Sequence, residues 1–482
     1  SRWRPKLFNK KGAGWRAYGV LYGPLLEFSV TEEGIDSTNR PYESEKQVEF
    51  ITNLVHNEEL QESSDGAVSG KITFMDHIVF DEKIPPMAIG GPLSETSGKI
   101  GISDRLSKML ERMTVVKDGI VEKKFEALYK FQADSIKAIN SASGKDSDSA
   151  VLISSRTGGG KTEAFIIPII DYCLTNREHP GTKAIIFYPT KALANDQASR
   201  IISMLYEINK IFINEGSPER ITVGMSHGDI PHNKQDLERT EKYWDGGVPI
   251  KCPKCNDGYL FGLEPKLVKC LSCKEELDFV FLFRDPNYGD LTDILITNPD
   301  TLVRDMFERP NHHGIFGRKI FCCSKCFAGY GTQKAGKCNA CQNTTLQEKK
   351  PLPPRFLVFD EIHQFKGTFG INALYLHERL KTIFKRYAKR NFEKDWPVCS
   401  IGSSATIADA GRFAKTFFGL DEGQITVIPK DDATKESYYE KAEGNFRKHV
   451  FLMPYRYRPA ATCGKVAGYL QARRLIGAKS EP

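Results

Sequence analysis

The sequence predicts an α/β protein built on a parallel sheet, and three observations support this fold class. Short apolar runs alternate with stretches of helical character from about residue 125 to 430, the usual pattern of a parallel sheet covered by helices. A Gly-rich turn follows the first run directly, as in phosphate-binding folds. Four Cys-x-x-Cys pairs interrupt the alternation at two places, so we expect two inserted metal-binding modules.

Seven apolar runs are expected to form the strands, because parallel strands are buried on both faces and read as continuous apolar stretches. The expected strands are Ala150–Ile153, Ala184–Tyr188, Ile221–Met225, Asp293–Thr297, Phe356–Phe359, Val398–Gly402 and Ile425–Ile428. Residues 1–110 carry no motif and are expected to form an N-terminal accessory domain. We expect residues 111–430 to hold the sheet and residues 431–482 to form a basic extension. The length of 482 residues agrees with about three domains.

Composition and charge narrow the class of protein. Hydrophobic residues make up 40% and charged residues 27%, which is typical of a globular chain. No apolar run approaches the roughly 18 residues of a membrane span, and no apolar segment of a signal peptide follows the N-terminus. A cytoplasmic location is therefore expected, where thiols stay reduced.

The net charge of +7 is concentrated near the C-terminus. From Lys441 onward there are nine Lys or Arg residues and two Glu residues, with Tyr455 and Tyr457 interleaved. Such a segment suits a nucleic-acid backbone. A solvated surface segment is the alternative.

The strongest motif is Ser-Arg-Thr-Gly-Gly-Gly-Lys-Thr at residues 155–162, between an expected strand and the helical run Glu163–Ile170. A strand, a Gly-rich turn, Lys-Thr and a helix form the arrangement that holds phosphates. Glycines let backbone amides approach the phosphates, and the helix N-terminus adds partial positive charge. Lys161 is expected to reach the β- and γ-phosphates of ATP, and Thr162 to bind Mg²⁺. The predicted turn residues are Thr157, Gly158, Gly159, Gly160, Lys161 and Thr162.

A second motif, Asp-Glu-Ile-His at residues 360–363, ends the apolar strand Phe356–Phe359. Asp360 is expected to hold Mg²⁺ through water. Glu361 is expected to orient or activate the attacking water. Adjacent acids are usually solvated, but these follow a buried strand downstream of a phosphate-binding turn.

Together these motifs make the chain resemble the first RecA-like lobe of a superfamily 2 DExH/DEAH-box helicase, over residues 125–410. Residues 360–363 resemble motif II, and Ser404-Ala405-Thr406 resembles motif III, which couples hydrolysis to strand movement. The resemblance implies that Gln132 reads the adenine edge and that Tyr129 or Phe131 stacks on the base. It implies the catalytic residues Lys161, Asp360, Glu361 and His363.

Three further segments resemble the nucleic-acid motifs of this family, namely motif Ia at residues 189–193, a His-Gly-Asp element at 226–229 and motif Ib at 297–300. Their hydroxyl, amide and ammonium groups suit phosphate oxygens, so binding is expected to be independent of base sequence and sensitive to salt. A simple turn is the alternative for Asn298-Pro299. The residues predicted to contact nucleic acid are Pro189, Thr190, Lys191, His227, Gly228, Thr297, Asn298 and Pro299.

Two segments narrow the resemblance further. These are residues 157–165 and 360–370, and the second is similar to the segment in MrfA-like and YprA-like DNA helicases. Residues 404–408 fit the same group. Related helicases occur in the anti-phage defence systems DISARM, as DrmA, and Druantia. The resemblance implies an ATP-dependent DNA helicase or translocase that acts on single-stranded DNA, with a defence role and a defence-complex partner among its implications. An ATP-switched DNA clamp or loading subunit without unwinding activity, and a DNA-repair helicase, are the alternatives.

The chain shows no Gln-x-x-Gly-Arg-x-x-Arg motif, which carries the arginine finger of the second lobe. Arginine fingers contribute about 10³–10⁵ in rate. We therefore expect this chain alone to bind ATP and Mg²⁺ but to hydrolyse ATP weakly. The second RecA-like lobe is expected in a longer parent chain or in a partner subunit.

The cysteine pairs have the spacing of zinc ribbons, because two Cys-x-x-Cys knuckles offer four thiolates to a tetrahedral ion. The first ribbon is expected at residues 250–275 and the second at 321–343, with fourteen and eleven residues between their pairs. An iron–sulfur cluster is the alternative. Closed Cys₄ sites leave no open coordination position, so structural roles are expected. The predicted ligands are Cys252, Cys255, Cys270, Cys273, Cys323, Cys326, Cys338 and Cys341.

Overall fold

The computed structural model divides the chain into two compact units, one of residues 87–438 and one that joins residues 1–86 with 439–482. No helix in the described part of the chain combines the length and apolar character needed to cross a membrane. The structure describes residues 26–31, 75–84, 87–117, 120–155, 159–231, 248–264, 267–282, 292–308, 320–327, 329–330, 338, 343–405, 407, 409–430, 432–439 and 445–454.

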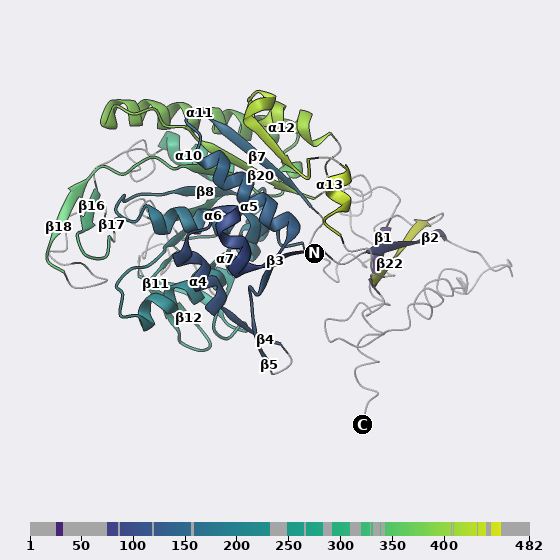
Figure 1. Ribbon diagram of the computed structural model, residues 1–482, viewed down its shortest axis with the longest axis horizontal. Coiled ribbons are helices and arrows are strands. Elements are labelled where there is room, and N and C mark those ends of the chain that lie inside the picture. Colours follow the sequence, from purple (N-terminus) through teal and green to yellow (C-terminus); the bar gives the residue numbers. More distant parts are fainter. Residues whose placement is uncertain are drawn as a thin grey trace, which may run out of the picture. The chain divides into compact units, whose positions relative to one another are not determined.

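The larger unit is built on an eight-stranded parallel sheet with the order β14-β9-β15-β8-β19-β20-β7-β21 (Figure 1). All seven expected strands lie in this sheet, so the α/β prediction is confirmed. The two-residue edge strand β14 is an addition, too short for a sequence pattern to show. The strands are β7 Ser149–Ser154, β8 Ala184–Phe187, β9 Val223–Ser226, β14 Val280–Phe281, β15 Ile294–Thr297, β19 Phe356–Phe359, β20 Cys399–Ser404 and β21 Ile425–Ile428.

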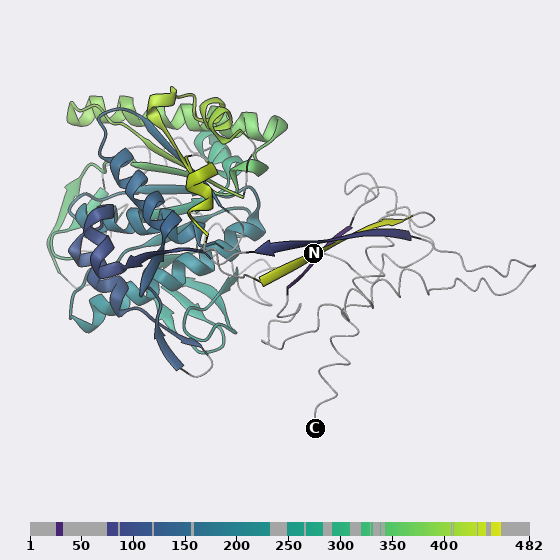
Figure 2. The same ribbon diagram turned by 45° about the vertical axis from the view of Figure 1, so that its right-hand side comes forward.

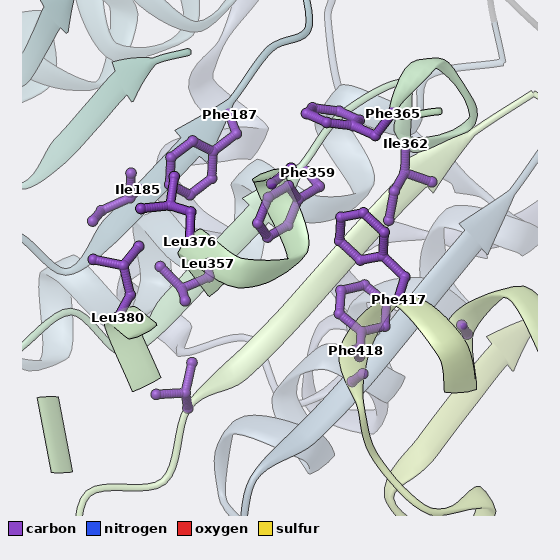
Figure 3. Packing of buried hydrophobic residues seen from close by; sticks show 14 of the residues in the cluster. Ile185, Phe187, Leu357, Phe359, Ile362, Phe365, Leu376, Leu380, Phe417 and Phe418 are labelled. Carbon is purple, nitrogen blue, oxygen red and sulfur yellow. The ribbon is translucent and has the colours of Figure 1, made fainter. Parts of the chain in front are cut away.

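Three helices pack on one face of the sheet: α10 (Pro299–Glu308), α11 (Gly367–Phe392) and α12 (Ala410–Phe418). Figure 3 shows the aromatic centre of this layer. The fully buried Phe359 ring stacks on Phe187 at 4.8 Å and meets Phe417 edge-on at 5.0 Å. Such ring pairs add to the energy of burial. Because Phe359 immediately precedes Asp360, this packing also fixes the strand end that carries motif II.

Helices α5 (Lys130–Ser143), α6 (Lys161–Thr175) and α7 (Lys191–Asn214) cover the opposite face (Figure 1). Helix α6 is buried nearly all round, as expected for a helix between a sheet and outer helices. A short 3₁₀ turn, η3 Ile362–Gln364, follows motif II, and another, η4 Glu422–Gln424, leads into β21. Helix α13 (Asp432–Glu436) ends this unit.

Residues 87–129 also belong to the larger unit. Helix α3 (Leu93–Ile100) packs on α5, and α4 (Asp104–Arg112) packs on α6 and α7. The expected domain boundary at residue 110 therefore falls inside α4, and the contacts place the division at Met87 instead. Two two-stranded antiparallel sheets complete this region: β3 Ile89–Pro92 with β6 Ala127–Tyr129, and β4 Thr114–Lys117 with β5 Ile120–Lys123.

The smaller unit contains a three-stranded antiparallel sheet (Figure 2). Strand β22 (Asn445–Pro454) lies in the middle, between β1 (Leu26–Thr31) and β2 (Met75–Ile84). Part of the expected basic extension is therefore a central strand that pairs with both N-terminal strands. Tyr455 and Tyr457 lie outside the described residues.

At the amino edge of the large sheet, one buried carboxylate joins three neighbouring strands. Asp293 precedes β15 and accepts hydrogen bonds from Lys183 Nζ, which precedes β8, at 2.8 Å, and from Arg177 Nη1 at 3.2 Å. The Thr222 amide and hydroxyl, which precede β9, both donate to it at 2.9 Å. Burial would raise the pKa of Asp293, but Lys183, Arg177 and Thr222 outweigh burial and hold this pKa at about 2.

We predict that Asp293→Asn lowers the free energy of unfolding by about 3–5 kcal/mol, because Lys183 and Arg177 lose a buried partner. The pKa of Asp293 is about 2 in the folded chain and about 3.9 unfolded. The stabilisation from ionised Asp293 is thus complete above about pH 4 and is lost as pH falls toward 2, because the unfolded chain binds the proton more tightly. Urea unfolding at pH 3 and pH 7 measures both effects.

The matched control is Asp278→Asn. Asp278 pairs with Arg220 at 3.1 Å, but its side chain is half exposed, so the expected change is under about 1 kcal/mol. Equal urea midpoints for Asp293→Asn and the wild-type chain would contradict the anchoring role of Asp293.

Candidate nucleotide site and nucleic-acid interface

Six predicted site segments follow six adjacent strands of the large sheet. Since parallel strands share one carboxyl edge, the segments gather along that edge, where ligands of open α/β sheets bind. Strands β9, β15 and β8 are neighbours and precede the three predicted nucleic-acid segments. Strands β19, β20 and β7 are the next neighbours and precede the Asp-Glu-Ile-His motif, the Ser-Ala-Thr motif and the Gly-rich turn, respectively. The sheet order thus separates the predicted nucleotide segments, called the nucleotide half below, from the predicted nucleic-acid segments, called the nucleic-acid half.

The Gly-rich turn ends where α6 begins. Gly160 is the N-cap of α6 with φ +82°, and a Cβ there would lie 2.4 Å from Gln132 Nε2, so both conformation and space require glycine. Lys161 is 7% exposed, and its Nζ donates to the Ser155 carbonyl at 3.0 Å. Thr157 and Gly158 lie outside the described residues, and Gly159 is buried.

Buried charges face this turn. Asp360 is 3% exposed, and burial raises its pKa to about 6. Burial lowers the pKa of Lys161, whereas the carboxylates of Glu361 and Asp360 raise it. These three charges therefore lie within electrostatic reach of one another in a poorly hydrated site. A carboxylate that has lost water and a lysine beside a helix N-terminus fit Mg²⁺ and a triphosphate, respectively.

The residues after Asp360 connect motif II to motif III. Glu361 has the left-handed backbone conformation, with φ +49°. His363 Nδ1 lies 2.8 Å from Ser404 Oγ and 3.3 Å from a Glu361 carboxylate oxygen. The Ser155 amide in turn donates to the Ser404 carbonyl at 3.2 Å. Hydrogen bonds therefore connect motif II to Ser404 and, through Ser404, to the start of the phosphate turn. Ala405 accepts from the Ser154 hydroxyl at 3.4 Å, and Thr406 lies outside the described residues.

The Q-motif region also contacts the phosphate turn. Gln132 is buried, its Oε1 accepts from the Tyr129 amide at 3.0 Å, and its Nε2 donates to the Gly160 carbonyl at 3.1 Å. These two bonds hold the Gln132 amide between Tyr129 and the phosphate turn, and each end of the amide keeps one further hydrogen-bonding position. Phe131 lies in the core beside Tyr438, whereas Tyr129 is 41% exposed. Of the two expected stacking candidates, Tyr129 is the accessible one.

On the nucleic-acid half, two helices begin at the sheet edge with side-chain caps. Thr190 Oγ1 accepts from the Leu193 amide at 3.3 Å at the start of α7, and Asn298 Oδ1 accepts from the Thr301 amide at 2.9 Å at the start of α10. Helix N-termini are suited to phosphates. Lys191 is exposed and pairs with Asp229 at 3.1 Å.

Three residues predicted to contact nucleic acid are buried at or just after the ends of β9 and β15. His227 Nε2 bonds Asn195 Oδ1 at 2.9 Å, and His227 Nδ1 accepts from the Asp229 amide at 3.3 Å. Thr297 Oγ1 donates to the Ser226 carbonyl at 2.7 Å, and Pro299 is also buried. The polar groups of His227 and Thr297 form hydrogen bonds inside the protein, so these residues position the exposed groups around them. Gly228 lies against Lys191, whose Nζ would be 2.8 Å from a Cβ at Gly228, and Pro189 is half-buried.

The comparison with known proteins agrees with this geometry. Residues 129–228, from Tyr129 through the phosphate turn and α7 to Gly228, match the DEAD/DEAH box helicase family. The matched segment covers about a fifth of the chain and is similar to this family. The Druantia protein DruE of Escherichia coli is 23% identical over an alignment of 393 residues that covers 74% of this chain and 20% of DruE.

Two further similarities are to a curated helicase and to a solved helicase structure. The ATP-dependent helicase hrq1 of Schizosaccharomyces pombe is 21% identical over 351 residues, covering 73% of this chain and 22% of hrq1. A crystal structure of the DUF1998 helicase MrfA bound to DNA and AMPPNP aligns with 73% of this chain and 31% of that one, at 17% identity and a TM-score of 0.39. This chain spans about a fifth of the length of the two curated relatives.

The larger unit carries two cysteine clusters on small antiparallel sheets. The first sheet has the order β10-β11-β12-β13 and lies in sequence between β9 and β14. The second has the order β17-β16-β18 and lies between α10 and β19. Their strands are β10 Val248–Lys251, β11 Tyr259–Glu264, β12 Leu267–Cys270, β13 Glu276–Leu277, β16 Ile320–Cys323, β17 Gly329–Tyr330 and β18 Leu346–Lys349.

In the first cluster, four sulfur atoms lie within 4.8 Å of one another. Cys252 and Cys273 are 3.6 Å apart, and Cys255 and Cys270 are 3.7 Å apart. Zinc–sulfur bonds of about 2.3 Å at tetrahedral angles need sulfur atoms about 3.8 Å apart, whereas a disulfide needs about 2.05 Å. The spacing therefore fits a bound ion. Within the cluster, backbone amide hydrogen bonds lower the pKa of Cys255 to about 7, whereas burial raises the pKa of Cys252 to about 12.

The second cluster repeats the same knuckle. Cys323, Cys326 and Cys338 lie within 4.8 Å of one another, and Cys341 lies outside the described residues. The Lys325 amide donates to Cys323 Sγ at 3.4 Å, as the Lys254 amide does to Cys252 Sγ. The neighbouring Cys322 instead donates to the Phe327 carbonyl at 3.3 Å. Cys323 rather than Cys322 is thus arranged as a ligand, as expected. In three knuckles the residue after the second cysteine has positive φ: Asn256, Lys274 and Phe327.

We predict that Cys323→Ser removes one equivalent of bound zinc, whereas Cys322→Ser keeps it, because only Cys323 Sγ joins the cluster. Cys252→Ser should remove a different equivalent. Metal analysis of purified variants by plasma mass spectrometry measures the stoichiometry, and visible absorption distinguishes an iron–sulfur cluster. Loss of metal from Cys322→Ser with retention in Cys323→Ser would contradict the assignment.

Proposed function

We propose that this chain is the ATP-binding lobe of a helicase or translocase that couples ATP hydrolysis to movement along single-stranded DNA. The observation that supports this most directly is the division of one sheet edge into a nucleotide half and a nucleic-acid half. The helicase domain implies the use of ATP. The choice of DNA follows the resemblance of residues 360–370 and 404–408 to DNA helicases.

In the proposed reaction, Lys161 holds the β- and γ-phosphates, and Asp360 with Thr162 holds Mg²⁺. Glu361 orients the attacking water and accepts its proton. His363 connects Glu361 to Ser404, so that the state of the phosphate site reaches motif III. Mg²⁺ supplies charge stabilisation at the phosphates when bound. Thr190, Lys191 and Asn298 face the phosphates of the strand through hydroxyl, ammonium and amide groups.

The similarity to the Druantia protein DruE over 74% of the chain supports a role in anti-phage defence. A partner protein of a defence complex belongs to this proposal. DNA repair is the competing role. Two zinc ions at the cysteine clusters complete the cofactors of the proposal, and both have structural roles because their ligand sets are closed.

We predict that Lys161→Ala weakens binding of an ATP analogue about 10- to 100-fold, because a charged hydrogen bond contributes about 1.5–3 kcal/mol. Glu361→Gln should bind ATP normally but hydrolyse it about 10²- to 10⁴-fold more slowly. The exposed Lys210 provides the control, and Lys210→Ala should change neither property. ATP-dependent strand displacement by the parent protein, lost in both variants, separates a helicase from an ATP-switched clamp.

We also predict weak hydrolysis by this chain alone, since its sequence shows no arginine-finger motif. Typical enzymes turn over about 10 times per second, and the finger contributes at least about 10³, so about 0.01 per second or less is expected with single-stranded DNA present. Steady-state phosphate release measures this rate. Robust turnover by the isolated chain would show that no second lobe is needed.

A further inference from the structure

Helix α7 touches the phosphate site through two side chains that no motif includes. The Thr162 hydroxyl donates to Gln197 Oε1 at 2.8 Å. One residue further along α6, the Glu163 carboxylate accepts from Arg200 Nη2 at 2.8 and 3.1 Å. The first turn of α6, which carries the proposed Mg²⁺ ligand, is therefore hydrogen-bonded to α7.

The Gln197 amide is held with its oxygen toward Thr162. Its Nε2 donates to Asp196 Oδ2 at 3.4 Å, and Arg200 Nη1 donates to its Oε1 at 3.5 Å. A hydroxyl that binds a cation uses an oxygen lone pair and keeps its proton to donate. With the proton directed at Gln197, the lone pairs of Thr162 are left for a cation. Partners of this kind orient metal ligands and typically change metal affinity about 10- to 100-fold.

The same helix carries the nucleic-acid half at its start. Thr190 caps α7, Lys191 is its first residue, and Asn195 bonds the buried His227 at 2.9 Å. Lys191 and Gln197 are six residues apart, about 9 Å along the helix axis. A single rigid element thus connects the exposed groups that face nucleic acid with the acceptor of the Thr162 proton.

We propose that Gln197 is a positioning residue that orients the Thr162 hydroxyl for Mg²⁺. Through α7, Gln197 also couples nucleotide binding to nucleic-acid binding. This inference rests on the function proposed above. It assigns a specific route for the coupling, which runs from Thr162 through Gln197 to Lys191 and to Asn195 with His227. If the contact only packed α6 against α7, its loss would destabilise the fold, and the size of this effect would not depend on Mg²⁺.

The test measures binding of a fluorescent ATP analogue with Mg²⁺ and with EDTA. With Mg²⁺, Gln197→Ala should bind about tenfold more weakly than the wild-type chain, and with EDTA the two should bind equally. Gln197→Glu keeps an acceptor oxygen and should restore Mg²⁺-dependent affinity. Ser203→Ala, which loses only the Ser203 bond to the Ser199 carbonyl on the same helix, is the matched control and should resemble wild type.

A second arm measures coupling as the ratio of nucleotide affinities with and without a single-stranded oligonucleotide. This ratio should fall at least about fivefold in Gln197→Ala, the lower range of allosteric coupling. An equal loss with Mg²⁺ and EDTA, or an unchanged coupling ratio, overturns the inference. A wild-type chain that binds no nucleotide overturns the proposed function itself, so the two failures are distinguishable.

Discussion

Lys161 and Asp360 are both buried at the carboxyl edge of the sheet, within electrostatic reach of each other, and the proposed nucleotide site depends on this arrangement. Burial makes both charges costly, lowering the pKa of the lysine and raising that of the aspartate to about 6. A triphosphate and a divalent cation would relieve both costs at once. The site is thus organised for a ligand whose charges are opposite to those of the protein.

The rest of the fold holds these charges in place. At the carboxyl end of β19, Phe359 packs among aromatic rings one residue before Asp360. At the amino edge, Asp293 binds groups that precede β8 and β9, two strands that end in nucleic-acid segments. Both edges of the sheet are therefore fixed, one by apolar packing and the other by a buried ion network. Fixed strands keep phosphate-facing groups within the narrow tolerances that catalysis requires.

Sequence reasoning located the strands and the motifs because their signals are local. Continuous apolar runs identified seven of the eight strands of the large sheet. Cysteine spacing identified the clusters that the structure describes. The remainder depends on tertiary contacts. His227 is buried and hydrogen-bonded to Asn195, and Phe131 lies in the core, although both residue types suited an exposed role. Gln197 has no motif around it, and its contact with Thr162 exists only because α7 packs on α6. Strand β22 pairs with strands more than 350 residues earlier, which no local pattern shows.

The most direct test of the account is an experimental structure of this chain with Mg²⁺ and a non-hydrolysable ATP analogue. The account predicts the triphosphate around Gly160 and Lys161, with Mg²⁺ between Thr162 and Asp360 and the adenine beside Tyr129. A nucleotide bound elsewhere, or Lys161 and Asp360 turned away from the phosphates, would contradict it.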